Sequence, residues 1–232
     1  MASRLLIISI IRPVSRFILV VASCQLWLLK PTAFADRESD SGAAVIREMN
    51  RARENPALYA TYVAELRSHL IDGYLVMPGH ARIRTKEGSA AFDEAIRFLR
   101  GAQPIAPLTF SPGMSRASAD HCAEQVNGGT GHGGCGASNP GSRISRYGTW
   151  SAAWGENISY GRANAREVVI ALIVDDGLPA RKHRKNIFNP AYNFAGAAFG
   201  PHAKFRSVCS MDFAGGFVER GGASVETLVA GN

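Results

Sequence analysis

Two histidines and a small group of carboxylates in the second half of the chain have the chemistry of a metal-binding or ligand-binding cleft. His132 lies in the glycine-rich stretch GGTGHGGCG, and Glu156 follows in WGENIS. Asp175 and Asp176 end an apolar stretch, and His183 follows in RKHRKN. Two imidazoles with one or two carboxylates suit a divalent metal, above all zinc. The alternative is a pair of histidine–carboxylate hydrogen bonds that hold loops together, which is the more common arrangement.

The glycines on both sides of His132 predict a shaped loop. They end the preceding helix and permit tight turns of the backbone. We therefore expect His132 to face a cleft that it shares with Glu156 and His183.

The common catalytic motifs are absent from the sequence. GGTGHGG lacks the Gly-Lys-Ser/Thr ending of a phosphate-binding loop, and the chain contains neither H-E-x-x-H nor G-x-S-x-G. No serine or cysteine stands beside a base as an evident nucleophile. A hydrolase that works without a metal is therefore not favoured.

The elements that must position these residues are predicted from hydrophobic periodicity and capping residues. Helices are expected over 43–71 with an interruption near Pro56, over 89–101, over 112–127 and over 164–177. An extended segment is expected at 154–161, a β-hairpin at 193–217, and loops at 72–88 and 138–150. This order indicates an α+β fold, with helices packed on a small antiparallel sheet.

The first 35 residues predict a secretory signal peptide that is cleaved after Ala35. Arginines precede the apolar run FILVVASCQLWLL, and the sequence Ala-Phe-Ala completes the pattern. One alternative is an uncleaved membrane anchor over residues 5–29. Another is a lipoprotein acylated at Cys24, within VASC. After the signal we expect a linker at 36–43, one folded domain at 44–217 and a polar tail at 218–232.

The charge of the mature chain does not favour nucleic-acid binding. The formal net charge of the full sequence is +7. Removal of the signal takes away four cations and no anion, which lowers the charge to +3. A charge of this size is not typical of a nucleic-acid partner.

Three cysteines remain after the signal: Cys122, Cys135 and Cys209. In an oxidising compartment, one disulfide and one remaining thiol is the simplest arrangement. A bridge between Cys122 and Cys135 would close a short loop around His132, and Cys209 is the alternative partner of either. No C-x-x-C pair exists, so a zinc site built from cysteines is not expected.

Four segments together resemble the CAP superfamily, also called the SCP domain, which includes cysteine-rich secretory proteins, venom antigens and plant pathogenesis-related proteins. These segments are MNRARENPALYA, GTGHGG, GENISYG and VDDGLPARKHRKNIF. The resemblance covers about residues 44–217, and its loops are similar to those of the bacterial, secreted branch. It implies an α-β-α sandwich, with helices on both faces of a small antiparallel sheet.

The resemblance also implies a cleft with two histidines and two acids. By motif these are His132, Glu156, His183 and an acid at the end of the intervening helix. Asp175 aligns best with that acid and Asp176 is its neighbour, although many relatives have glutamate there. Lys182 replaces a usual glycine, and it would oppose metal binding if it pointed into the cleft.

The resemblance implies a secreted protein, periplasmic or extracellular, whose cleft binds a lipid, a sterol or a cell-envelope component, with or without zinc. Contact with the membrane would come only through the signal or a lipid anchor at Cys24. The alternative is a hydrolase in which a metal on His132 and His183 activates water, Glu156 is the general base and Asp175 orients a histidine. A third hypothesis is a structural envelope protein. We favour binding over catalysis, because one fold carries many functions.

Overall fold

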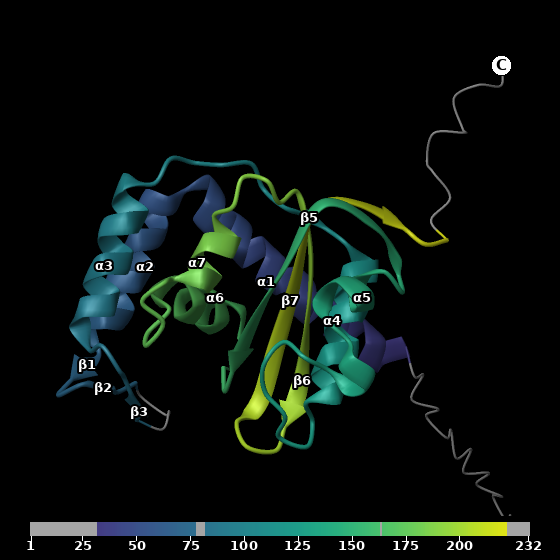
Figure 1. The fold of residues 1–232 in the computed structure, drawn as a ribbon. Helices are drawn as coiled ribbons and strands as arrows, with labels where there is room; N and C mark the ends of the chain where they lie inside the picture. Colours follow the sequence, from purple (N-terminus) through teal and green to yellow (C-terminus); the bar gives the residue numbers. More distant parts are fainter. Residues whose placement is uncertain (1–31, 78–81, 163, 222–232) are drawn as a thin grey trace, which may run out of the picture. The chain divides into compact units, whose positions relative to one another are not determined.

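The structure is a computed structural model that describes residues 32–77, 82–162 and 164–221 (Figure 1). For residues 32–41 only the course of the backbone is described. Most of the expected signal peptide, including Cys24, lies outside the described residues. Most of the expected tail lies outside them as well. Within these ranges, no helix combines the length and the apolar character that crossing a membrane requires.

Helices and strands are interspersed along the chain, and four of the strands form one sheet. The helices are α1 (Thr32–Glu54), α2 (Pro56–Ser68), α3 (Ser89–Gly101), α4 (Pro112–Glu124), α5 (Pro140–Ile144), α6 (Ala165–Val174) and α7 (Lys182–Ile187). The strands are β1 (Leu70–Ile71), β2 (Tyr74–Leu75), β3 (Ile83–Arg84), β4 (Thr109–Phe110), β5 (Gly148–Tyr160), β6 (Phe194–His202) and β7 (Arg206–Glu219). Strands β1–β3 form a small antiparallel sheet, and the four-stranded sheet has the order β4-β6-β7-β5.

Three helix starts are set by side chains that accept a hydrogen bond from an exposed backbone amide. Asn55 caps α2, Ser111 caps α4 and Asn164 caps α6, each by accepting from the amide three residues later. An unpaired amide at a helix start costs free energy, so a polar residue at this position fixes where the helix begins. The predicted break at Pro56 and the predicted starts of α4 and α6 are confirmed.

The four-stranded sheet is covered by helices on both faces. Strands β6, β7 and β5 pair in antiparallel order, and the short β4 pairs with β6 in parallel. Along β7, Met211 and Phe213 point into the main core, to which α1, α2, α3 and α6 contribute. Asp212 and Ala214, which alternate with these two residues along the strand, face α4 on the other side. Figure 1 shows α4 and α5 on one side of the long strands and α6 and α7 on the other. The predicted α+β class, with helices on both faces of a small sheet, is confirmed.

Gly196 allows α4 to lie directly on the sheet. A methyl group at this position of β6 would collide with the backbone of Ser115 and with Met114. Helix and strand backbones therefore approach closely here, and α4 becomes a fixed platform for the polar side chains on its inner face.

Three segments differ from the sequence prediction. Residues 36–43, expected to be a linker, belong to α1. Residues 72–88, expected to be a loop, contain β2 and β3. Residues 138–150, also expected to be a loop, contain α5 and the start of β5. In α5, Asn139 and Ser142 form a reciprocal capping box that stabilises a helix too short to show hydrophobic periodicity.

The expected disulfide is not present among Cys122, Cys135 and Cys209. Cys122 is buried on the α4 face of the sheet, where its thiol donates to the carbonyl of Ala198. Cys135 is exposed, and Cys209 is buried in the main core on the opposite face. Cys122 and Cys209 are separated by the sheet, so a bridge between them would require the backbone to move.

Candidate functional site

Glu156 lies on β5, the edge strand of the four-stranded sheet, and is paired directly opposite Asp212 of β7. Its side chain lies on the α4 and α5 side, where it meets Arg143 and Ser210. The next residue, Asn157, lies toward α7 instead and donates to the carbonyl of His183. Residues from both faces of the sheet therefore meet at the edge formed by β5.

The glycine-rich loop that carries His132 is held by hydrogen bonds from three elements. Gly131 adopts a φ of +91°, which glycine tolerates and other residues rarely adopt. Its amide donates to the Tyr160 hydroxyl, and its carbonyl accepts from Gln125, the residue directly after α4. His202 of β6 is buried, and its Nε2 atom lies 2.8 Å from the carbonyl oxygen of Gly129. The loop is shaped as predicted, and it presents His132 at its surface.

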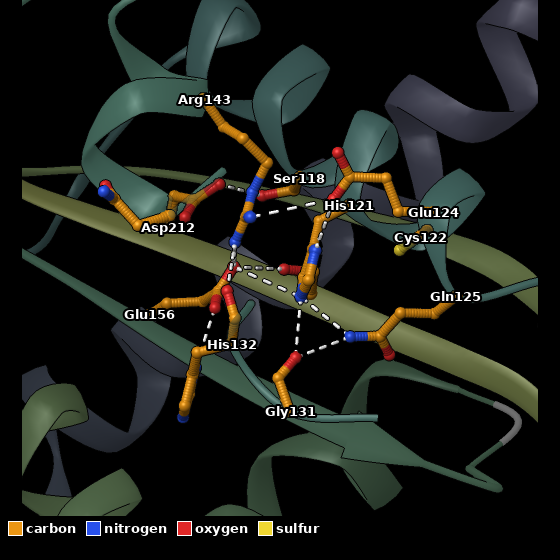
Figure 2. A network of polar contacts seen from close by, with 12 residues as sticks. Ser118, His121, Cys122, Glu124, Gln125, Gly131, His132, Arg143, Glu156 and Asp212 are labelled. Carbon is orange, nitrogen blue, oxygen red and sulfur yellow. Dashed lines mark hydrogen bonds and ion pairs between the residues drawn. The ribbon is translucent and has the colours of Figure 1, made fainter. Parts of the chain in front are cut away.

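His132, Glu156 and Arg143 form the centre of the site (Figure 2). The His132 Nδ1 atom lies 2.7 Å from Glu156 Oε1, and Arg143 donates to Glu156 Oε2 at 2.8 Å and to the His132 carbonyl at 3.1 Å. An ionised carboxylate only accepts hydrogen bonds, so Nδ1 carries the hydrogen and Nε2 of His132 is left as an acceptor. The side chain of His132 is 56% exposed, whereas those of Glu156 and Arg143 are 1% and 0% exposed.

Asp212 is a second carboxyl group beneath this centre, and the sequence prediction did not include it. It is fully buried and accepts a hydrogen bond from Ser118 at 2.8 Å, while its Oδ1 atom and the Arg143 Nε atom have no hydrogen-bond partner among the residues that the structure describes. Burial and then the nearby charge of Glu156 raise the pKa of Asp212 well above its usual value. The signal that could have indicated Asp212 is a charged residue at an inward position of the apolar hairpin.

His121 and Glu124 on α4 extend the polar network. His121 is fully buried, and it contacts Glu124 at 3.1 Å through Nδ1 and the Gly131 carbonyl at 2.9 Å through Nε2. Glu124 also lies 3.7 Å from Arg143. Arg143 is therefore close to carboxylates on both sides, in the short helix α5 that was expected to be loop. The only signal for this helix in the sequence was the Asn-Pro pair at its start.

His183 is held by Asp175 on the other side of the β5 edge. His183 Nδ1 lies 2.7 Å from Asp175 Oδ1, and the His183 amide donates to Asp175 Oδ2 at 3.0 Å. Asp175 caps the end of α6 with a φ of +55°. The nearly buried carboxylate thus sits behind the imidazole, fixes its orientation and leaves Nε2 as the outward atom.

Helix α7, which carries His183, is anchored to α3 by arginines. Arg184 makes two 2.7 Å hydrogen bonds to Glu94, and Arg181 makes two more to Glu87. The Arg184 guanidinium holds the pKa of Glu94 below its usual range. Bidentate pairs of this kind fix geometry as well as adding stability.

Asp176 does not belong to the cleft. Its two carboxylate oxygens accept from the amides of Lys86 and Glu87, at 2.7 and 2.8 Å. Of the two neighbouring acids, Asp175 is the one that contacts a cleft histidine.

His132, Glu156 and His183 line one pocket of about 550 Å³. The segment Leu178-Pro179-Ala180 forms an apolar part of its wall, and two lysines and an asparagine complete the lining: Lys182, Lys185 and Asn186. Both lysines add positive charge, whereas the charge of Glu156 is balanced by Arg143. The lining of the pocket therefore carries a net positive charge.

The described residues fit a metal only through the two imidazoles. No group of three or more His, Cys, Asp or Glu side chains in the described ranges could hold a metal ion. Glu156 is already bonded to His132 and Arg143, and Asp175 lies behind His183. A carboxylate on Nδ1 is the usual support for a histidine that binds zinc through Nε2. The chemistry of these two residues suits a metal, but the four predicted residues do not form one ligand set.

Comparisons with known proteins place this chain in a family. The sequence profile of the CAP family, described as the cysteine-rich secretory protein family, matches residues 49–213, well over half of the chain. A search of curated proteins finds no match.

Three solved structures resemble the fold. One is an outer surface protein of Borrelia burgdorferi, 15% identical over 47% of this chain and 78% of its own, with a TM-score of 0.39. Another is an extracellular SCP-domain protein of Bacillus anthracis, 17% identical over 53% of this chain and 38% of its own, with a TM-score of 0.39. The third is a cysteine-rich secretory protein of Staphylococcus aureus, 13% identical over 55% of this chain and 37% of its own, with a TM-score of 0.35. The family match over residues 49–213 carries the conclusion: this chain belongs to the CAP family of cysteine-rich secretory proteins.

Proposed function

We propose that the protein is secreted or located in the cell envelope, and that its cleft binds an anionic group of a cell-envelope component. The observation that carries this proposal is the lining of one pocket by His132, His183, Lys182 and Lys185. The lysines supply charge to the anionic group, the imidazole Nε2 atoms can accept hydrogen bonds from hydroxyl groups of the same component, and the Leu178-Pro179-Ala180 wall covers an apolar part.

A divalent metal is a second possible occupant, held through Nε2 of His132 and His183. When bound, it would supply a Lewis-acid contact for the anionic group. Titration of the purified protein with zinc by calorimetry tests this, with His132→Ala and His183→Ala. Loss of zinc binding in both variants supports the two-histidine site. Absence of binding, or binding unchanged in both variants, contradicts it.

The hydrolase hypothesis is weaker because Glu156 is not available as a general base. Its side chain is 1% exposed, and its oxygens accept from His132 and Arg143. A general base must reach the proton that it removes. Hydrolysis of ester, peptide or glycan substrates that is lost in Glu156→Gln would revive this hypothesis.

Ligand binding is tested with poly(glycerol phosphate) as the anionic probe and dextran as the neutral probe. We expect binding of the first alone, weakened about fivefold in Lys182→Gln/Lys185→Gln, since two partly exposed ion pairs contribute about 1 kcal/mol in total. Lys204→Gln is the matched control, because Lys204 is an exposed lysine in the β6–β7 turn, outside the pocket. Equal binding of both probes, or no effect of the double variant, would contradict the proposal and leave a structural envelope role.

A further inference from the structure

A second pocket, of about 520 Å³, lies across helix α7 from the histidine cleft. Arg184 of α7 bonds Glu94 of α3, and Asn186 of α7 bonds the backbone of β5, so α7 lies between α3 and β5 (Figure 1). The histidine cleft opens between α7 and β5, whereas this α3–α7 pocket opens between α7 and α3. Lys185 lines both pockets, so its side chain lies on the ridge between them.

The wall of the α3–α7 pocket offers rings to a ligand. Phe98 of α3 and Phe188, directly after α7, meet edge to face with their ring centroids 5.1 Å apart. Pro190 is exposed and extends the same wall. Aromatic and proline rings present apolar surface, which suits the carbon atoms of a ligand better than its charged groups.

Most of the charges beside the α3–α7 pocket cancel one another. Arg184 is paired with Glu94, and Arg181 with Glu87, in each case through two hydrogen bonds of 2.7 Å. Lys185 is exposed and adds positive charge on the ridge. The pocket therefore has a nearly neutral floor, and its rim is cationic on the side of the histidine cleft.

We propose that a linear polyol phosphate, in which phosphodiester groups alternate with neutral carbon units, binds across α7. One phosphate lies in the histidine cleft near Lys182, the next contacts Lys185, and the carbon unit beyond it lies against Phe188 and Pro190. The proposal rests on the function proposed above and adds that the ligand is a chain held by two pockets.

The order of surfaces along this path favours such a chain over other ligands. The path runs from cationic, at Lys182 and Lys185, to apolar, at Phe188 and Pro190. Charges separated by neutral units match this order, whereas a polyuronate carries a charge on every ring. A helix is about 10 Å across with its side chains, so a single small anion cannot reach both pockets.

The dependence of binding on chain length tests the proposal. The probes are glycerol phosphate, its dimer and chains of several repeats, titrated by calorimetry into the purified protein. If one repeat fills the whole site, the affinity per mole of repeat is the same at every length, because a longer chain only offers more registers. We expect it to rise about tenfold or more in the long chain, since the second contact is then intramolecular.

Pro190→Glu separates the two pockets. Pro190 lines the α3–α7 pocket and does not line the histidine cleft. The added carboxylate should repel the long chain and weaken its binding about fivefold, and it should leave glycerol phosphate unchanged. Pro190→Gln has the same shape without the charge and should keep most of the long-chain affinity. Both variants lose the proline ring, so any change in stability from that loss is common to them.

Lys204→Gln is the control for net charge. It lowers the charge by one, as Pro190→Glu does, but it lies outside both pockets and should not weaken the long chain. The proposal is overturned if the affinity per repeat is the same at every length, or if Pro190→Glu and Pro190→Gln bind the long chain equally. Stronger binding of a galacturonate chain of equal length would identify a polyuronate and overturn it as well.

Failure of this proposal and failure of the proposed function give different results. If glycerol phosphate binds and is weakened in Lys182→Gln/Lys185→Gln, but the affinity per repeat does not rise with length, only the two-pocket proposal fails. If neither glycerol phosphate nor the long chain binds, the function proposed for the histidine cleft fails with it.

Discussion

Replacement of Arg143 by methionine would show how strongly the buried guanidinium stabilises the cleft. Arg143 donates to Glu156, to Ser138 and to the His132 carbonyl, and it lies beside Glu124. Methionine keeps much of the volume of the side chain but removes the charge and the donors. Glu156 would then remain buried beside Asp212 without a cation.

The size of the effect follows from burial. The side chains of Arg143 and Glu156 are 0% and 1% exposed, so water cannot replace the lost partner. Removal of one member of a buried ion pair costs about 3–5 kcal/mol. For a domain of this size the melting temperature shifts by about 2–4 °C per kcal/mol, which predicts a decrease of roughly 10 °C.

Urea denaturation followed by circular dichroism measures the loss. Arg146→Met is the matched control: Arg146 pairs with Asp120 on the surface, where the side chains are 47% and 31% exposed, so its loss should be within about 1 kcal/mol. The double variant Arg143→Met/Glu156→Gln should recover about 1.5 kcal/mol or more relative to additivity, because no charge is left buried. A loss in Arg143→Met no larger than in the control, or strict additivity in the double variant, would refute the reasoning.

Two further predictions concern a proton and a thiol. The raised pKa of Asp212 means that the folded protein keeps a proton which the unfolded chain releases above about pH 4, so this group makes stability fall as pH rises. As the pH rises from 5 to 8, the free energy of unfolding measured by urea denaturation should therefore fall less in Asp212→Asn than in the original protein. A steeper fall in the variant would contradict the assignment. Alkylation followed by mass spectrometry should modify Cys135 in the folded protein, and Cys122 and Cys209 only after unfolding. A disulfide between Cys122 and Cys135 would instead leave Cys135 unmodified.

Much of the fold was predictable because its signals are local. The apolar periodicity of α3 and α6 and the caps at Asn55, Ser111 and Asn164 act within a few residues. The hairpin of β6 and β7 was predictable for the same reason. Helix α5 and the β1–β3 sheet were missed, since elements of two to five residues show too little periodicity to be distinguished from loops.

The site was predictable in part. Sequence indicated His132, Glu156 and His183, and the structure brings these three to one pocket. It left Asp175 and Asp176 as alternatives, because neighbouring residues differ in direction only once the end of α6 is known. Arg143 and Asp212 were missed. In the structure Arg143 donates a hydrogen bond to Glu156, and Asp212 lies opposite Glu156 in the sheet.

The sequence by itself determined the longer helices, the hairpin, the family resemblance and the identity of the cleft histidines, because these depend on residue types at short spacings. Only the tertiary structure decided what each carboxylate does. The pairing of β5 with β7 places Glu156 opposite Asp212, and α5 inserts Arg143 beside Glu156. Burial and the proximity of charges far apart in sequence decide which group keeps a proton, which is paired and which faces a ligand.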